Sequence, residues 1–439
     1  MDFKFFDLAL TKIIYVERRG YIMRLPGFYK LSVQDRLKKV AEFANLSEEE
    51  VKALISSAGL PIEVADRMIE NVIGTFELPL GIATNFLIDG KEYLIPMVIE
   101  EPSVVAAASN AARMAREGGG FTTDFTAPVM IGQIQVVDVR NPESARFEIL
   151  RNKSEIIEKA NECDPMLLKL GGGCRDLEVR IIDSIFGKML VVHLLVDVRD
   201  AMGANAVNTM CEKVAPIVGR ISGGKPLLRI VSNLSVYRIA RAKALFKKEA
   251  IGGEEVVDGV MKAYAFAEAD PFRCATHNKG IMNGISALMI ATGNDFRAVE
   301  AGAHGYAAIR GYKPLTKYEI NENGDLVGTI EVPISAGIIG GATQVNPLAK
   351  ICLKILGVKS SGELARVAAA LGLAQNFAAL RALATEGIQR GHMELHARNV
   401  AIMAGARGSE IDRIAELMVK DGKIRIDYAK ELLSKLRGE

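Results

Sequence analysis

The chain has 439 residues, enough for roughly two to four domains or subdomains. Hydrophobic residues make up 49% and charged residues 25%, a composition that excludes an intrinsically disordered chain. The 55 Lys and Arg residues nearly balance the 53 Asp and Glu residues, so the net charge of +2 provides no basic field for nucleic acid. The five cysteines form no Cys-x-x-Cys pair, which argues against a disulfide framework and a thiolate zinc site and favours a reducing compartment.

No membrane or secretion signal stands out in the sequence. The longest apolar stretches, such as residues 189–196, fall short of the roughly 20 residues that a membrane-spanning helix needs, and are typical of buried strands. Asp7 and Lys12 interrupt the apolar N-terminal segment, and no small-residue cleavage site follows it. We therefore expect no membrane partner and a cytoplasmic location. Residues 1–22 carry no pattern to which we assign a role.

Residues 23–126 have a helical pattern. Ser47, followed by three glutamates, predicts the start of a helix. An extended passage at 93–99 leads through Glu100-Glu-Pro-Ser103 into an alanine-rich stretch, 104–116, which is followed by three glycines. Pro favours the first turn of a helix and Gly its C-terminal end, so this stretch is predicted to be a helix. Its small side chains place it inside the fold.

Residues 127–238 change to strand-like periodicity interrupted by helical stretches. The predicted strands are 129–139, 146–150, 177–185, 188–198 and 227–231. The predicted helices between them are 153–169 and 204–218. This alternation indicates a separate small α+β domain of about 110 residues.

The rest of the chain returns to helical patterns. The predicted helices are 279–291, 295–309, 362–386, 388–404 and 409–418, with one strand at 326–333. We therefore predict an α+β fold in three parts. Residues 1–126 and 239–388 form a large, mostly helical domain. Residues 127–238 form a small α+β domain inserted into it, and residues 389–439 form a C-terminal helical flap.

Common nucleotide and nucleophile motifs are not present: no Gly-x-Gly-x-x-Gly follows a strand, and there is no P-loop or Gly-x-Ser-x-Gly. His392 and His396 are four residues apart on a predicted helix, as in some zinc sites. Glu394, however, points about 200° away from His392, which does not fit the zinc protease patterns. The two histidines are then either structural or, with Arg390 and Arg398, part of a cation-capable surface on a movable helix.

Four further polar stretches also leave alternatives open. Lys279, expected at a helix start, is either a solvated lysine or an ammonium that seeks an anion. Glu101 and Asp295 fit simple helix N-terminal acids as well as acid–base residues. Asp197–Met210 passes from a predicted strand into a helix through Gly203, a junction where backbone N–H groups can reach phosphates.

Several of these segments, taken together, resemble hydroxymethylglutaryl-CoA (HMG-CoA) reductase, in particular the soluble bacterial and archaeal class II branch. They extend from about residue 23 to about residue 405 in the order typical of that family. The matching segments are 70–79, Glu100-Glu-Pro-Ser103, Gly119-Gly-Phe-Thr-Thr123, Gly171-Gly-Gly-Cys-Arg-Asp176, 197–210, Thr276-His-Asn-Lys-Gly-Ile-Met-Asn-Gly284, Ala291-Thr-Gly-Asn-Asp295 and 383–393.

The resemblance implies an oxidoreductase that uses two nicotinamide hydrides to interconvert HMG-CoA and mevalonate plus CoA. It assigns catalysis to Glu101, Lys279, Asp295 and His392. Lys279, steadied by Asp295, would stabilise the alkoxide formed by hydride attack. His392 would protonate the CoA thiolate, and Glu101 would protonate mevaldehyde during the second reduction.

The resemblance also implies a small cofactor domain that is not a Rossmann fold. Its predicted cofactor contacts are Asp200, Met202, Gly203, Ala204, Asn205 and Asn233. Asp164 lies seven residues before Gly171, where NAD-using members have an aspartate. A carboxylate there would bind a ribose diol and repel a 2′-phosphate, which predicts NADH in preference to NADPH.

The predicted acyl-CoA contacts are Ser103, Arg273, Asn283, Gln375 and His396, and Arg273 suits the free carboxylate of the substrate. The residue patterns predict no metal, and the resemblance implies a homodimer with shared active sites, with a hexamer left open. The alternatives are another acyl-CoA-processing enzyme, such as a lyase or synthase, and a non-catalytic protein that binds a CoA ligand.

Overall fold

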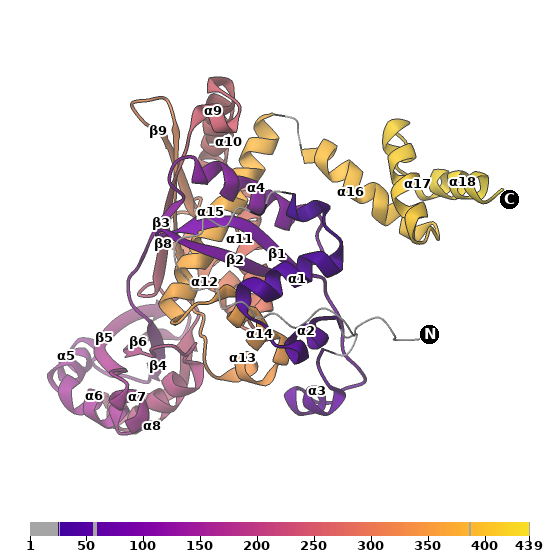
Figure 1. Ribbon diagram of the computed structural model, residues 1–439. Coiled ribbons are helices and arrows are strands. Elements are labelled where there is room, and N and C mark those ends of the chain that lie inside the picture. The colour runs from indigo at the N-terminus through magenta and orange to yellow at the C-terminus, as the bar shows by residue number, and fades with distance from the viewer. Residues whose placement is uncertain (1–24, 26, 56–58, 386–387, 439) are drawn as a thin grey trace.

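The computed structural model describes residue 25 and residues 27–55, 59–385 and 388–438, with the backbone only for 388–395. The chain is built from two β-sheets and many helices (Figure 1), which confirms the predicted α+β class. Residues 1–22, to which the sequence assigns no role, lie outside the described residues.

The larger sheet has six strands. In spatial order these are β2 (Lys91–Val98), β1 (Leu80–Ile88), β3 (Phe121–Phe125), β8 (Ile239–Phe246), β10 (Leu326–Pro333) and β9 (Thr316–Ile320). All neighbours are antiparallel except β1 and β3, which meet at Ile88 and Phe121. Helices still make up most of this part of the chain, as predicted, but the sequence analysis did not predict the strands β1, β3, β8 and β9. In β8, three of the five buried residues are Ala240, Ala242 and Ala244, and alanine is a strong helix former that does not indicate a strand.

Helix α15 (Ser361–Ala384) lies at the centre of the large core and contacts β3, β8 and β10 as well as α4 (Val104–Arg116), α10 (Glu254–Ala269) and α11 (Pro271–Ala291). Among the described residues, it is the one helix long and apolar enough to cross a membrane, but 67% of that window is buried inside the fold. It is therefore a core helix. Small residues permit the close packing, since a Cβ on Gly372 would lie 2.8 Å from Cδ1 of Ile285 on α11.

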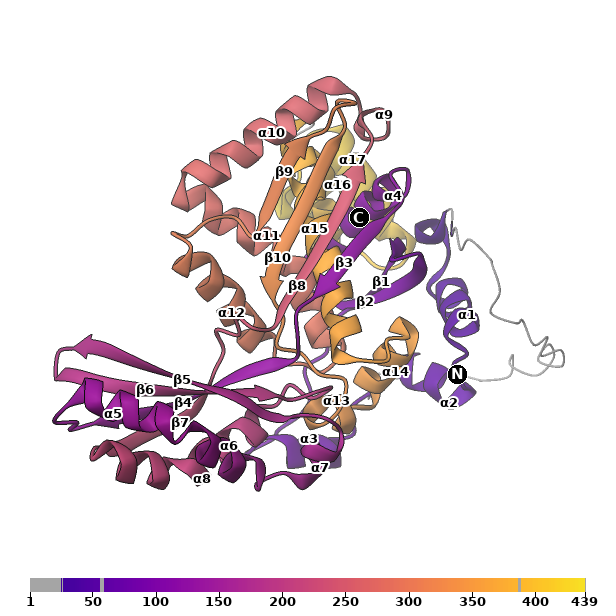
Figure 2. The same cartoon turned by 90° about the vertical axis from the view of Figure 1, so that its left-hand side faces the viewer.

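The smaller sheet is antiparallel and has its own apolar core. Its strands in spatial order are β5 (Gly173–Ser184), β6 (Gly187–Asp197), β4 (Val129–Val137) and β7 (Lys225–Ser232). Figure 2 shows helices along one side of this sheet: α5 (Pro142–Arg151), α6 (Lys153–Asn161), α7 (Pro165–Lys169) and α8 (Ala204–Ser222). The strand predicted at 146–150 was wrong, because Pro142 at the first position of α5 starts a helix that includes it.

The remaining elements surround these two sheets. They are η1 (Phe28–Lys30), α1 (Val33–Ala44), α2 (Glu48–Ile55), α3 (Ile62–Met68), α9 (Lys248–Ile251), α12 (Phe296–Ile309), α13 (Gly341–Val345) and α14 (Pro347–Leu356). Ser47 starts α2 with a capping box: its hydroxyl accepts from the Glu50 N–H at 3.2 Å, and the Glu50 carboxylate accepts from the Ser47 N–H at 2.7 Å.

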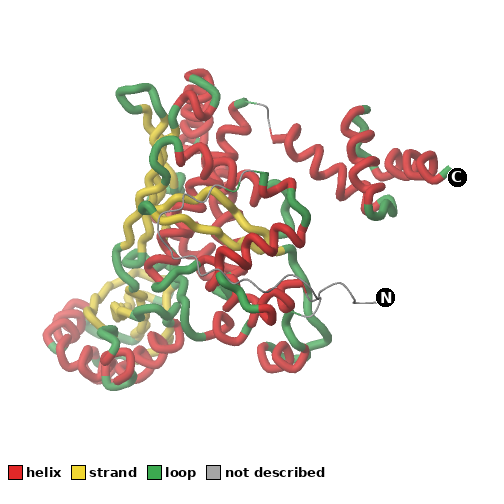
Figure 3. Tube along the Cα trace, viewed as in Figure 1, coloured by secondary structure: helices red, strands yellow, loops and turns green. Residues whose placement is uncertain are grey.

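Three helices close the chain: α16 (Ile388–Met403), α17 (Ser409–Lys420) and α18 (Ile426–Arg437). Figure 3 shows them beside the rest of the molecule. They have a separate apolar core that includes Val400, Ile414, Met418 and Leu433. This part of the chain therefore has apolar packing of its own.

The stacked pair of Phe246 on β8 and Phe377 on α15 fastens the central helix to the large sheet, with ring centroids 3.7 Å apart and both side chains fully buried. We expect Phe377→Ala to destabilise the protein by about 3–5 kcal/mol, because it removes a buried ring and leaves a cavity. The midpoint of chemical denaturation measures this. Phe186→Ala, at a 90% exposed position, is the matched control and should change stability by less than about 0.5 kcal/mol. Equal midpoint shifts in the two variants would contradict the assignment.

Candidate active site

Lys279 lies in the middle of α11 and not at the helix start that the sequence suggested. The helix begins earlier because Pro271 occupies its first position and the Asp270 carboxylate accepts a hydrogen bond from the Arg273 N–H at 2.7 Å. The helix dipole therefore does not act on Lys279 as expected. Its side chain is 59% exposed in this single chain.

Lys279 pairs with Glu101. Glu101 lies in the turn between β2 and α4, and α11 packs against β2, which brings the two side chains together. The Lys279 Nζ atom donates to Oε2 of Glu101 at 2.9 Å. Asn283, one helical turn after Lys279, donates to the same oxygen at 3.5 Å. An exposed ion pair of this kind adds little to stability, so its value lies in the chemistry it can do.

Asp295 caps α12, as the sequence allowed. Its Oδ1 atom accepts from the N–H groups of Arg297 at 3.1 Å and Ala298 at 3.2 Å, and its carboxylate pairs with the Arg297 guanidinium. Among the described residues, it makes no hydrogen bond or ion pair with Lys279 or Glu101. The structure thus brings two of the predicted catalytic side chains together and leaves Asp295 with other partners. His392 lies in α16, and its side chain is outside the described residues.

A further carboxylate near Lys279 was missed by the sequence analysis. Glu300, on α12, accepts from the Ser286 hydroxyl at 2.6 Å and lies 3.4 Å from Nε2 of His304. Burial alone would raise the pKa of Glu300, but hydrogen bonds from His304 and Ser286 and the charges of His304 and Lys279 lower it overall. The i,i+4 spacing of Glu300 and His304 was the available signal.

Two of the predicted substrate residues have buried polar atoms without a partner. These are the Ser103 hydroxyl, at the start of α4, and the Gln375 Oε1 atom, on α15. Leaving such an atom unpaired costs about 1–3 kcal/mol, so both are suited to a ligand. Arg273 is half-buried on α11, and burial lowers its pKa. His396 is exposed on α16.

The predicted cofactor residues form a short loop between β6 and α8. Gly203 has a φ of 96° at the start of α8, and a Cβ there would lie 2.4 Å from Cγ1 of Val198, so the position requires glycine. Asp200 is held by the Ser361 N–H, which donates to Oδ1 at 2.7 Å. The half-buried Met202 and Ala204 and the exposed Asn205 complete the loop. Such an entry into a 19-residue helix fits a phosphate-bearing cofactor.

The other two predicted cofactor residues lie on different elements. Asn233 is exposed in the turn between β7 and β8. Asp164 caps α7, because its Oδ1 atom accepts from the Leu167 N–H at 2.8 Å. The structure thus gives Asp164 a structural partner that the sequence did not indicate. The residues that the structure describes contain no group of three or more His, Cys, Asp or Glu side chains that could hold a metal ion.

Comparison with known proteins agrees with the function expected from the site residues. A family model described as hydroxymethylglutaryl-coenzyme A reductase matches residues 32–397. The chain belongs to the HMG-CoA reductase family. This membership assigns it HMG-CoA reductase activity, an NAD(P)H-dependent oxidoreductase reaction of the mevalonate pathway.

Individual relatives support this assignment over nearly the whole chain. The chain is 78% identical over 420 residues to a 3-hydroxy-3-methylglutaryl-coenzyme A reductase of Archaeoglobus fulgidus, covering 96% of each protein. It is 33% identical over 435 residues to a probable 3-hydroxy-3-methylglutaryl-coenzyme A reductase of Borreliella burgdorferi, covering 94% of this chain and 98% of the relative.

Solved structures of the family share the fold. The 3-hydroxy-3-methylglutaryl-coenzyme A reductase of Streptococcus pneumoniae matches with a TM-score of 0.81 and 41% identity, over 94% of this chain and 100% of the other. A second structure from that organism, a class II reductase bound to NADPH in open conformations, matches with a TM-score of 0.80 and 41% identity. It covers 83% of this chain and 100% of that one. The NADPH bound in this relative agrees with the NAD(P)H-dependent reaction assigned by the family.

Proposed function

We propose that this HMG-CoA reductase carries out both reductions of HMG-CoA at the Glu101–Lys279 pair, assisted by Asp295 and His392. The observation that carries the proposal is the 2.9 Å contact between the Lys279 ammonium and the Glu101 carboxylate. A positive charge and a potential proton donor then lie side by side on rigid elements. Both steps of the reaction need these two groups.

Lys279 would stabilise the negative charge that develops on the oxygen atom in each reduction. When bound, the reduced nicotinamide supplies the hydride, and the acyl oxygen becomes an alkoxide. An ammonium has three N–H donors, so Lys279 can bind this oxygen while it keeps its contact with Glu101. Asp295, whose carboxylate pairs with Arg297 in this structure, would turn to Lys279 when the site is completed by substrate.

His392 and Glu101 would each donate one of the two protons that the reaction requires. Collapse of the first product, a hemithioacetal, breaks the carbon–sulfur bond and releases CoA thiolate, whose reference pKa of about 8.5 allows an imidazolium to protonate it. His392, on α16, supplies this proton in the proposal. Glu101, after it has taken up a proton from solvent, then gives that proton to the oxygen of mevaldehyde as the second hydride arrives, which yields mevalonate.

The substrate-binding part of the proposal rests on side chains around this pair. Ser103 and Gln375 offer the buried unpaired atoms, and Asn283 already shares the Glu101 carboxylate. Arg273 would hold the free carboxylate of the HMG group, because a guanidinium binds a carboxylate through two N–H groups. His396 would contact the CoA portion from α16.

The smaller sheet and its helices, residues 127–238, would bind the cofactor through Asp200, Met202, Gly203, Ala204, Asn205 and Asn233. We propose NADH as the preferred cofactor, because the Asp164 carboxylate would accept hydrogen bonds from a ribose diol and repel a 2′-phosphate. Residues 1–126 and 239–388 would bind substrate and form the subunit interface. Residues 389–439 would close the site as a flap.

A homodimer with shared active sites, alone or as the unit of a hexamer, and a cytoplasmic location complete the proposal. Support comes from the apolar segment between α3 and β1, where Ile69, Ile73 and Phe76 are 66%, 103% and 91% exposed. A second subunit would remove these side chains from water. It would also cover Lys279, which is largely exposed in one chain.

Loss of nicotinamide absorbance on addition of HMG-CoA tests the activity, and two variants test the roles. We expect Lys279→Ala to lower kcat by at least about 100-fold with HMG-CoA and with mevaldehyde, because both reductions form an alkoxide. His392→Gln should impair HMG-CoA reduction and spare mevaldehyde reduction. Lys262→Ala, at an exposed lysine paired with Asp258 on α10, is the control and should keep full activity. Equal losses with both substrates in His392→Gln would contradict its role.

Cofactor choice is tested at Asp164. We expect Asp164→Ala and Asp164→Arg to raise the ratio of kcat/KM for NADPH to that for NADH, since each removes the negative charge that repels a 2′-phosphate. Steady-state kinetics with both cofactors measure the ratio. Because Asp164 also caps α7, Asp164→Asn serves as the control that retains a capping side chain without the charge. An unchanged ratio in all three variants would refute the proposed preference.

The dimer is tested at Ile73. We expect Ile73→Asp to weaken subunit association and to lower activity in parallel, because the charge would have to enter the apolar interface. Sedimentation velocity and activity assays over a range of enzyme concentrations measure both. Ile185→Asp, at a 95% exposed position on the β5–β6 hairpin, is the matched control. A monomeric Ile73→Asp variant with full activity would argue against shared active sites.

A further inference from the structure

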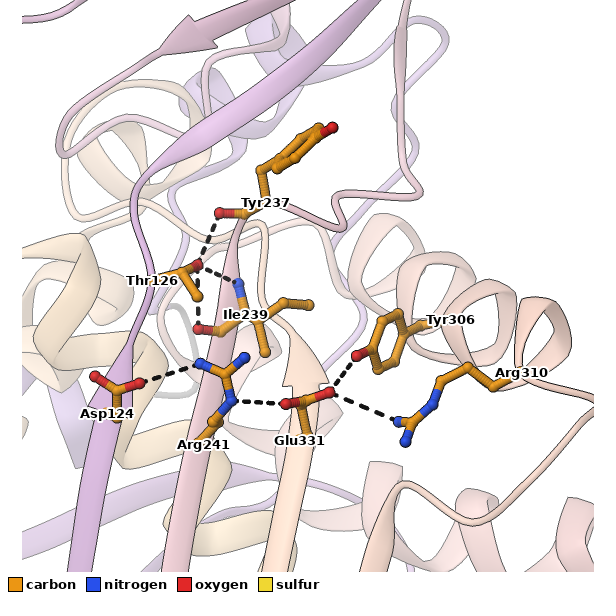
Figure 4. A network of polar contacts seen from close by, with 8 residues as sticks. All are labelled: Asp124, Thr126, Tyr237, Ile239, Arg241, Tyr306, Arg310 and Glu331. Carbon is orange, nitrogen blue, oxygen red and sulfur yellow. Dashed lines mark hydrogen bonds and ion pairs between the residues drawn. The ribbon is translucent and has the colours of Figure 1, made fainter.

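A fully buried arginine lies where the two sheets join. Arg238 is 0% exposed and precedes β8, in the second of the two connections between the sheets. Thr126, in the first connection, ties the two together. Its hydroxyl donates to the Tyr237 carbonyl at 2.7 Å and accepts from the Ile239 N–H at 3.0 Å (Figure 4).

Next to this junction, ion pairs of Arg241 connect three strands of the large sheet. Arg241 on β8 pairs with Asp124 on β3 at 3.1 Å and with Glu331 on β10 at 2.6 Å (Figure 4). Glu331 in turn accepts from the Tyr306 hydroxyl and lies 3.7 Å from Arg310, just after the end of α12. The connection that carries Arg238 is therefore attached to the helix that Asp295 caps.

The Arg238 guanidinium bonds to backbone carbonyls of two other loops. It donates to the carbonyls of Ala201 at 3.2 Å and Met202 at 3.3 Å, and to the carbonyl of Ala336. Burial lowers the pKa of Arg238 to about 10, and the charges of Asp200 and Asp197 oppose that shift. Nη1 and Nη2 make all of these bonds, whereas the buried Nε atom has no hydrogen-bond partner among the described residues. A buried charge is costly unless hydrogen bonds offset its burial, and here the bonds that do so also hold the two loops in place.

The loop at 334–339, which contains Ala336, packs closely on the loop at 200–205, which contains Ala201 and Met202. The Ile338 N–H donates to the Asp200 carbonyl at 2.9 Å, and Ala201 and Ile339 form a parallel bridge. A Cβ on Gly337 would lie 2.5 Å from the Met202 nitrogen. The backbones of the proposed cofactor loop and of the loop at 334–339 are therefore in direct contact at Gly337, with no space for a side chain between them.

The loop at 334–339 also contacts the residue that precedes Asp295, a predicted catalytic residue. The Gly337 N–H donates to Oδ1 of Asn294 at 2.8 Å, and Asn294 is the neighbour of Asp295. A continuous set of contacts therefore runs from Arg238, through the loop at 334–339, to the residue beside Asp295. The other cofactor candidate, Asn233, lies against α12 as well, since a Cβ on Gly302 would be 2.7 Å from its carbonyl oxygen.

We propose that Arg238 is a positioning residue that fixes the cofactor loop, Asp200 to Asn205, relative to the start of α12 and Asp295. The inference rests on the proposed function and deepens it. Arg238 bonds only to backbone carbonyls and acts through the loops it holds. Lysine is a poor substitute, because its ammonium has three donors on a flexible stem, whereas the guanidinium has five in a fixed plane.

The test compares Arg238→Met and Arg238→Lys with the wild-type enzyme. We expect Arg238→Met to lower kcat/KM for the nicotinamide cofactor on the order of 100-fold, because a displaced loop misaligns the hydride, with the KM for HMG-CoA unchanged. Arg238→Lys should recover part of this loss. The deuterium isotope effect with 4-deuterated cofactor should rise in Arg238→Met, as hydride transfer becomes rate-limiting.

Arg116→Met is the matched control. Arg116 is also a poorly exposed arginine, but it pairs with Glu92 at 2.6 Å on α4 and β2, away from the loops. This variant should lose stability and keep its cofactor kinetics, which separates positioning from a general loss of packing.

Gly337→Ala gives a second route to the same displacement. It keeps the guanidinium and pushes the added methyl group against Met202, so the same selective loss in cofactor kcat/KM is expected, even if Arg238→Met fails to fold. A rise in the KM for HMG-CoA as large as the fall in kcat/KM for the cofactor, or unchanged cofactor kinetics in a folded variant, would overturn the positioning role. A wild-type enzyme that fails to oxidise the cofactor with HMG-CoA would instead overturn the proposed function.

Discussion

The contact between the Lys279 ammonium and the Glu101 carboxylate depends on the packing of α11 between β2 and α15. Glu101 is on the turn that follows β2, so the 2.9 Å distance exists only if the helix and strand keep their register. Small residues make this possible, because Gly372 on α15 leaves room for Ile285 and Gly284 on α11 faces Gln375. The apolar core thus determines where charge is placed in the site.

Local signals in the sequence were enough to predict several elements. The alanine-rich helix between Ser103 and the three glycines was predicted with the observed bounds, as was the strand that ends at Pro333. Both are bounded by residues whose backbone preferences are strong. Asp295 was predicted to fit a helix N-terminal acid as well as an acid–base residue, and its carboxylate does cap α12. The catalytic and binding roles came from the resemblance, because no local pattern decides between a cap and an acid.

What was missed depends on contacts between distant parts of the chain. The alanine-rich β8 has no local preference for a strand and becomes one because β3 and β10 pair with it. Lys279 was predicted to begin a helix because the stretch around it is polar and gives no apolar helical pattern, whereas the helix begins at Pro271. Glu300 and Arg238 were not singled out, since their partners Ser286 and Ala336 are known only from the folded structure.

Helix α15 has a mechanical consequence. Its first residue, Ser361, is bonded to Asp200 in the loop after β6, and its other end precedes α16, which carries His392. A straight helix of 24 residues is about 36 Å long and resists bending, so a displacement at one end is carried along its axis to the other. A dinucleotide that displaced the proposed cofactor loop would therefore also act on the far end of this helix, from which the chain continues to α16 and the proposed proton donor His392.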